Sequence, residues 1–471
     1  MKPYLKTINI LVLLAVFPGC TMLGIDYHRP DNVLPASYAE TDAQATAGDV
    51  KTMPNQWWTL FQDKQLNSLV ETAFKQNTNI QLAVARIEEA DAQMREVGAA
   101  LLPSVDLGGG ATRSRVTELG AFPATGNNPR NNFNLSLNSS VELDVWGKLR
   151  SAKDASRANF LATQYAKDGV MWSLSSLVAN NYLIIRSLDS QLKVNQDNQA
   201  ISEDSLKLVK RRLEGGVVSI LDVHQAELIV TDLKSQALEL KRQRALSEHQ
   251  LGVLTGDLSL KINQADLLAL PTPPTPPAGL PSSLMEARPD VRQAEQAMVA
   301  ANANITIAKA ALYPSISLTG AFGGESLELG DIIKSAARIW SLGLSLNLPI
   351  FNSGKLNSRV DQATAQQKQV LANYESSVQN AFKEVNDALV NVRLYKERDV
   401  IAQQKQEIAK NMLDVAQNRY KAGYVSYIDV LDAQRSHHEA TLSFVQNRQN
   451  VLTATVDLFK ALGGGWQQDK S

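Results

Sequence analysis

The sequence carries one pattern twice: RLEGGVVSILDV at residues 212–223 returns as RYKAGYVSYIDV at residues 419–430. The shared residues are Arg-x-x-x-Gly-x-Val-Ser-x-x-Asp-Val, and the offset is 207 (419 − 212 = 207). Gly147-Lys148-Leu149 returns at the same offset as Gly354-Lys355-Leu356. A third echo, Leu-x-Pro-Ser, closes an Ala-rich stretch at 101–104 and again at 312–315. The chain is therefore predicted to be a tandem repeat of one structural unit.

Each repeated pattern predicts a tight turn between two antiparallel helices. Gly216 and Gly423 suit the left-handed residue that ends a helix, and Ser219 and Ser426 suit the N-cap of the returning helix. The helix before each turn is expected to be long, over about 151–213 in the first copy, because no proline lies in 131–270 or after 349. The Ala-rich stretches at about 66–102 and 284–312 predict one further helix per copy.

The long helices also show the period of a supercoil. In the second copy, apolar or aromatic residues recur in alternating steps of three and four, which is a heptad pattern. Its members are Leu371, Tyr374, Val378, Ala381, Val385, Ala388, Val392 and Tyr395. The first copy repeats the pattern in the same register, at Met171, Leu174, Val178, Asn181, Ile185 and Leu188.

Two segments alternate with a period of two residues and predict strands. Apolar residues occupy every odd position of 133–145 except Ser139, and Leu342, Leu344, Leu346, Leu348 and Ile350 follow the same rule in the second copy. Weaker alternation at 105–111 and 316–322 supplies a hairpin partner for each. The expected fold is mixed α+β and mostly helical, with four strands per chain.

These strands allow two interpretations. An antiparallel sheet could pack its apolar face on a helix, as in many soluble proteins. Alternatively, strands of about ten residues with one apolar and one polar face are typical of outer-membrane barrels. In that case an open four-stranded sheet cannot stand in lipid, and closure needs about eight strands or more. Eight, twelve or sixteen strands from two, three or four chains would all satisfy this requirement.

The start of the chain resembles a secretory signal that ends at a cysteine. Lys2 and Lys6 precede an apolar run at 8–17 that is too short to span a bilayer, and Gly19 precedes Cys20, the only cysteine. The pattern is similar to that of a bacterial lipoprotein, in which this thiol is acylated and Cys20 becomes the first residue. The alternative is an ordinary cysteine near a signal. The residue after this cysteine is Thr21 rather than Asp, and the resemblance to lipoproteins then favours a location in the outer membrane.

Composition and missing motifs exclude several function classes. The 471 residues carry 47 basic and 48 acidic side chains, a net charge of −1 that argues against a nucleic-acid binder. A single cysteine forms neither an intramolecular disulfide nor a thiolate cluster. No catalytic or phosphate-loop motif is present, and His437 and His438 are adjacent, so a helix cannot aim both at one metal. We predict no enzyme activity, no cofactor and no metal site.

The chain resembles the TolC-like outer membrane factors, most closely the lipoprotein branch that serves resistance-nodulation-division (RND) efflux pumps. The resemblance rests on Asp26-Tyr-His-Arg-Pro30, Trp57-Trp58-x-x-Phe61, the two Leu-x-Pro-Ser junctions and Tyr420-x-Ala-Gly423 with its downstream acidic residues. It implies a homotrimer whose twelve-stranded β-barrel continues into a helical periplasmic tunnel. It also implies a periplasmic adaptor and an inner-membrane RND transporter as partners, and export of drugs or other small toxic solutes.

The resemblance also nominates site residues. It implies a periplasmic gate at Arg419, Ile428, Asp429 and Asp432, with first-copy counterparts Arg212, Leu221, Asp222 and Gln225. Asp429 and Asp432 share one helix face, but they could equally be solvated surface charges. The two turns would be the surface that docks the adaptor, through Gly215, Gly216, Val218, Ser219, Gly423, Val425 and Ser426. Plain turn chemistry also explains these glycines.

The predicted divisions of the chain follow from the repeats and the prolines. Six of the 17 prolines lie within 271–281, which predicts an extended connector between the copies. The divisions are the signal 1–19, a lipid-anchored segment 20–63, the first repeat 64–270 with hairpin 104–145, the connector 271–283, the second repeat 284–462 with hairpin 315–350, and the tail 463–471. Two rival functions remain: a type I protein-secretion duct with the same architecture, and a soluble helical tether.

Overall fold

A computed structural model describes residues 27–30, 34–35, 37–38, 56–117, 119, 126, 128–276 and 284–464. The predicted signal 1–19, Cys20, and parts of the 20–63 segment, the connector and the tail lie outside the described residues. The chain divides into two compact units. The sheet unit comprises Met1–Asp31, Arg86–Thr163 and Gln293–Tyr374, and the helical unit comprises Asn32–Ala85, Gln164–Arg292 and Glu375–Ser471.

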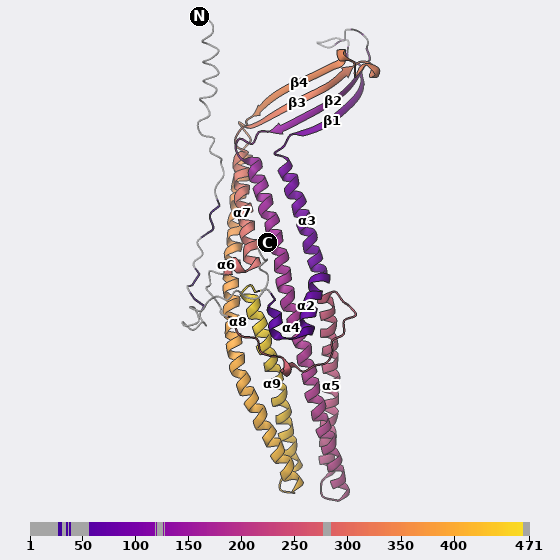
Figure 1. Ribbon diagram of the computed structural model, residues 1–471, viewed down its shortest axis with the longest axis vertical. Helices are drawn as coiled ribbons and strands as arrows, with labels where there is room; N and C mark the ends of the chain where they lie inside the picture. Colours follow the sequence, from indigo (N-terminus) through magenta and orange to yellow (C-terminus); the bar gives the residue numbers. More distant parts are fainter. Residues whose placement is uncertain are drawn as a thin grey trace. The chain divides into compact units, whose positions relative to one another are not determined.

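The sheet unit contains four antiparallel strands in the order β1-β2-β3-β4 (Figure 1). The first copy supplies β1 (Ser104–Ser114) and β2 (Arg130–Glu142), and the second supplies β3 (Ser315–Ser326) and β4 (Arg338–Asn347). The prediction of four strands in two hairpins is confirmed. Two 3-10 turns, η5 (Leu329–Asp331) and η6 (Ser335–Ala337), lie between β3 and β4, and β2 pairs with β3 to join the copies.

Two strands end before the predicted limits, each for a local reason. Strand β2 stops at Glu142 rather than 145, because the Asp144 carboxylate accepts hydrogen bonds from the backbone N–H groups of Leu149 (2.8 Å) and Arg150 (2.9 Å). It thereby serves the first turn of the following helix. Strand β4 stops at Asn347 rather than 350, since Pro349 has no N–H to donate to a ladder.

The helices that lead into the strands are broken, which corrects the prediction of one helix per copy. In place of a helix over 66–102 there are α2 (Lys64–Gln76) and α3 (Thr78–Ala99). Asn77 is extended at the break, where its side chain accepts from Asn79 N–H and donates to the Leu254 carbonyl.

The second copy breaks at the same place in its repeat. Here α6 (Leu284–Ala287) is followed by α7 (Pro289–Ala310). Arg288 precedes a proline, which disfavours helical backbone at Arg288 but suits the first position of a new helix. The two breaks are separated by 288 − 77 = 211 residues, the same offset as the two Leu-x-Pro-Ser junctions (312 − 101 = 211).

Each copy ends in a long helix and an antiparallel return helix. They are α4 (Lys148–Glu214) with α5 (Ile220–Thr255), and α8 (Lys355–Lys421) with α9 (Tyr427–Ala461). Both α4 and α8 contain 67 residues, a length of about 100 Å at 1.5 Å per residue. A short 3-10 turn, η3 (Leu267–Ala269), follows α5. Among the described helices, none combines the length and apolarity needed to cross a bilayer.

The heptad prediction is confirmed by burial. In α8, Tyr374, Val378, Ala381, Val385, Ala388 and Val392 are all buried, and in α4 so are Leu174, Val178, Ile185, Leu188 and Leu192. The pattern therefore marks the face by which each long helix packs.

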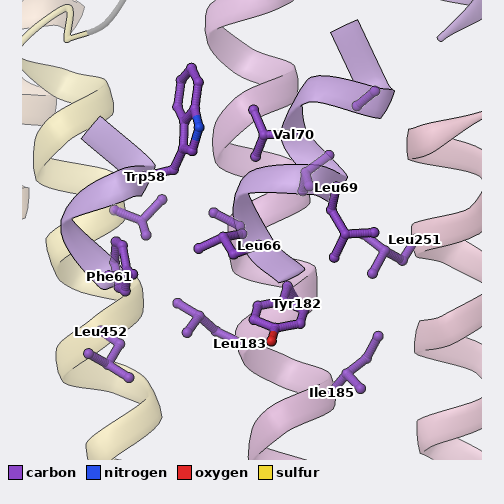
Figure 2. Close-up of a cluster of buried hydrophobic side chains, with 14 of the residues drawn as sticks. Trp58, Phe61, Leu66, Leu69, Val70, Tyr182, Leu183, Ile185, Leu251 and Leu452 are labelled. Carbon is purple, nitrogen blue, oxygen red and sulfur yellow. The ribbon is translucent and has the colours of Figure 1, made fainter. Parts of the chain in front are cut away.

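The main core of the helical unit gathers around α2 and the 3-10 turn η2 (Trp57–Phe61). Figure 2 shows Leu66, Leu69 and Val70 of α2 within one buried cluster with Tyr182 and Leu183 of α4, and Leu69 lies toward Leu251 of α5. Asp63 caps α2 by accepting from the N–H groups of Gln65 (2.8 Å) and Leu66 (3.2 Å), while its other oxygen accepts from the Tyr182 hydroxyl (2.7 Å). Asp63 thus joins the start of α2 to the long helix α4.

Candidate functional site

The register of the sheet separates its two faces by chemistry. Leu107 pairs with Leu137, Leu137 with Phe322, and Phe322 with Trp340, so one row of apolar side chains crosses all four strands. The next row toward Ser104 contains Val105, Ser139, Gly320 and Leu342. Leu107, Leu137, Phe322, Trp340 and Leu342 are each between 48% and 75% exposed, which is an unusual surface for a protein in water. We call this side the apolar face.

The opposite face is polar in every strand. It presents Asp106 and Gly108 from β1, a run of Asn and Ser from β2, Thr319 from β3, and Ser341 and Ser345 from β4. Ser136, Asn138 and Ser140 make hydrogen bonds to neighbouring polar groups on this side. A sheet with one apolar and one polar face matches the wall of a membrane barrel, apolar toward lipid and polar toward an aqueous bore.

The two helical turns have nearly identical backbone structure. Gly216 (φ 73°) and Gly423 (φ 81°) are left-handed, and the N–H of the following residue returns to Arg212 O or Arg419 O at 2.9 Å. Ser219 and Ser426 then cap α5 and α9, as predicted. Gly215, by contrast, keeps φ below zero. These conformations explain the repeated pattern as turn chemistry.

The predicted gate carboxylates have different local roles. Asp429 belongs to a capping box in which Ser426 donates both its N–H (2.9 Å) and its hydroxyl (2.6 Å) to the carboxylate. These bonds, aided by nearby Arg419, hold the Asp429 pKa below its ordinary value. Asp222 makes the same box with Ser219. Asp432 is free of such a role and only faces Arg435 at 3.5 Å, with both side chains largely exposed.

The remaining predicted gate residues lie around these caps. Ile428 and Leu221 are exposed by 55% and 61%, and Gln225 is partly buried. Arg419 is exposed in the last turn of α8 and forms no ion pair within the part of the chain described. Val218 and Val425 pack against a small buried cluster that contains Val209, Val223, Ala226, Tyr420, Tyr427 and Val430. The residues of that cluster come from both helix pairs, α4 with α5 and α8 with α9.

Sequence reasoning missed the contact that joins the two turns. Arg212 lies over the Tyr420 ring, 4.3 Å from its centroid, and donates to the Tyr420 carbonyl at 3.2 Å. Further along, Gln434 of α9 donates to Ser202 and Asn198 of α4 in a buried polar contact. A comparison of the two copies could have pointed to Tyr420, because the first copy has Leu213, and no aromatic ring, at the matching position (420 − 207 = 213). Arg419 therefore has no equivalent ring at that position of the first copy.

A family model described as "Outer membrane efflux protein" matches residues 69–257 and 280–464. The chain belongs to the outer membrane efflux protein family. The toluene efflux pump outer membrane protein TtgF of Pseudomonas putida is 34% identical over all of this chain and 98% of its own length. The cation efflux system protein CusC of Escherichia coli is 32% identical over 98% of this chain and 99% of its own length.

Solved channels share the fold. The outer-membrane channel OprN superposes with a TM-score of 0.88 at 28% identity, covering 94% of this chain and 99% of its own. The CusC structure gives 0.84 at 30% identity, with 94% and 100% covered. This chain is therefore a TolC-like channel of the outer membrane with a periplasmic tunnel, and it serves as an efflux exit duct. Its family is not a family of enzymes, and membership decides against a soluble tether.

Proposed function

We propose that three copies of this chain form one duct, which takes small toxic solutes from an inner-membrane RND transporter and a periplasmic adaptor to the cell exterior. One observation carries the assembly: within the described sheet, β1 and β4 each pair on one side only. Unpaired edges are not tolerated in lipid, so strands of other copies must cover them. Three copies supply twelve strands, enough to close around an aqueous bore.

The names of the relatives support the cargo class. TtgF and CusC are named for toluene and cation efflux, and a further relative, ArpC of Pseudomonas putida, is named as part of an antibiotic efflux pump. These names favour efflux over the type I protein-secretion duct. We also propose that Cys20 carries the lipid anchor, on the grounds of the signal-like sequence before it.

The native mass of the mature protein, extracted in detergent, tests this assembly. We expect a trimer whose N-terminal peptide carries acyl chains on Cys20. A monomer that needs no detergent would contradict the duct. A trimer with an unmodified N-terminus would contradict the lipid anchor alone.

We further propose that Asp429 and Asp432, with Arg419 and Ile428, narrow the periplasmic opening. Three copies of each carboxylate around one axis would repel one another and attract cations. The first copy would contribute its matching residues to the same opening, namely Arg212, Leu221, Asp222 and Gln225. The glycine turns at 215–219 and 423–426 would offer the adaptor its docking surface. The Arg212 contact with Tyr420 supports this arrangement, since it links the two turns of one subunit.

The gate predicts that Asp429→Ala with Asp432→Ala raises both the single-channel conductance and the influx of large antibiotics several-fold. Loss of the α9 capping box is a competing cause, because Asp429 closes that box. Ser426→Ala is the matched control, since it removes the hydroxyl of the same α9 box and keeps both carboxylates. Unchanged conductance in the double variant would contradict the gate, and an equal rise in the control would assign the effect to the lost cap.

A further inference from the structure

The connection between β3 and β4 lies against the apolar face of the sheet, where its residues Ile332, Ile333 and Lys334 line one cavity with Leu107, Leu137 and Phe322. Gly324 lies at the end of β3 directly under this connection. A Cβ atom at Gly324 would collide with the carbonyl oxygen of Ile332, so the close approach requires glycine. The connection also exposes Leu327, Leu329 and Ile333 by 62%, 65% and 85%. An apolar connection resting on an apolar face is suited to lipid rather than to water.

The connection and the sheet together line an open, solvent-accessible cavity of about 320 Å³. Its floor is the apolar row Leu107, Leu137 and Phe322, which come from three adjacent strands. Ile333 also lines it, as do two cationic residues, Lys334 and Arg338. The lining thus combines apolar side chains with two cations, which suits a molecule with an apolar chain and an anionic group.

The charges on the apolar face are confined to one end. Within the four described strands, the only charged residues on this face are Arg113 and Arg338, and both lie where their strand meets a hairpin connection. No acidic residue of these strands points to this side. The other ends of the strands meet helices, which belong to the periplasmic tunnel of the channel. The cations therefore lie at the level of the outer leaflet.

The two cationic residues of the lining differ in their partners. Lys334 forms an ion pair with Asp331 in the same connection. A lysine ammonium has three donors, so the pair leaves donors for a further anion. Arg338 forms no ion pair within the residues described, although its guanidinium offers a fork that matches a phosphate. A phosphate between the two side chains would neutralise this part of the face.

We infer that this cavity binds an anionic, phosphate-bearing lipid of the outer leaflet. One acyl chain lies against Leu107, Leu137 and Phe322, and the phosphate is held between Lys334 and Arg338. The lipid would fix the β3–β4 connection on the barrel wall. The inference depends on the location in the outer membrane but not on the proposed gate or cargo.

Titration of the delipidated full-length channel tests this inference, with bound lipid counted by native mass spectrometry. The probes are phosphatidylglycerol, phosphatidylcholine with the same acyl chains, and inorganic phosphate alone. We expect phosphatidylglycerol to bind about tenfold more tightly than phosphatidylcholine, equivalent to about 1.4 kcal/mol. Lys334→Ala with Arg338→Ala should abolish that preference. Arg338→Lys, which keeps the charge, should retain most of it.

Arg130→Ala is the matched control, because Arg130 lies at the same end of the sheet but on its polar face, opposite Ser114. We expect its lipid preference to equal that of the unchanged protein. Equal binding of the two lipids, or a preference that survives in the double variant, would overturn the inference. Competition by inorganic phosphate as strong as that by phosphatidylglycerol would overturn the lipid as the ligand. The same spectra report the assembly of each variant.

Discussion

Replacing Leu342 with arginine is expected to destabilise the inserted channel by about 2–4 kcal/mol for each subunit, and to remove most of it from the outer membrane. Leu342 lies near the middle of β4 on the apolar face, and its side chain is 75% exposed. It rests on Gly320 of the neighbouring strand without filling any core. An arginine at such a site on a water-soluble surface would cost almost nothing.

The size of the effect therefore reports what covers this face. At about 1.4 kcal/mol per factor of ten, the expected cost corresponds to a roughly 30- to 700-fold shift against insertion. The amount of assembled channel in the outer-membrane fraction, relative to total protein, measures it.

Ser341→Arg is the matched control for this substitution. Ser341 is the preceding residue of the same strand and points to the polar face, where it pairs with Ala321. In a closed barrel this side chain lies in water, so the control should insert normally. If both variants insert equally well, the apolar face does not contact lipid, and the barrel interpretation is wrong.

The sequence predicted those parts of the fold that depend on a repeating contact. The heptad positions of α8, such as Val378 and Val385, are buried because a long helix packs one continuous stripe. The strand faces were predictable for a similar reason, since alternate side chains must lie on opposite sides. Ser219 and Ser426 were predictable as caps, because a cap depends only on residues within the same turn.

Features that depend on distant partners could not be predicted. Asn77 interrupts a good helical pattern because its side chain reaches the carbonyl of Leu254, 177 residues later. The contact between Arg212 and Tyr420 likewise joins residues 208 positions apart. The capping role of Asp429 was also not predicted, since only the geometry revealed that its carboxylate accepts from Ser426 in a capping box. The fold of the β3–β4 connection over the apolar face carried no periodic signal.

Replacing Trp57 with alanine is expected to lower the free energy of unfolding of the helical unit by about 3–5 kcal/mol. Trp57 has no exposed surface, and its ring stacks on Phe459 of α9 with centroids 5.6 Å apart. Its edges meet Trp58 and Phe61, which contact the same core. Because these neighbours are held by α2, α4 and α9, the surrounding helices cannot simply collapse into the space left by the indole.

Trp57→Phe is the control, because it keeps an aromatic ring against Phe459. The indole N–H of Trp57 has no hydrogen-bond partner among the described residues, so phenylalanine loses volume but no hydrogen bond. It should therefore cost clearly less than alanine. The midpoint of guanidinium denaturation, followed by far-ultraviolet circular dichroism in detergent, compares the three proteins. Equal midpoints for alanine and tryptophan would mean that the 57–61 segment only covers the helices. A large drop in the midpoint of the alanine variant alone would mean that this segment stabilises the packing of α9 on the α4–α5 helix pair.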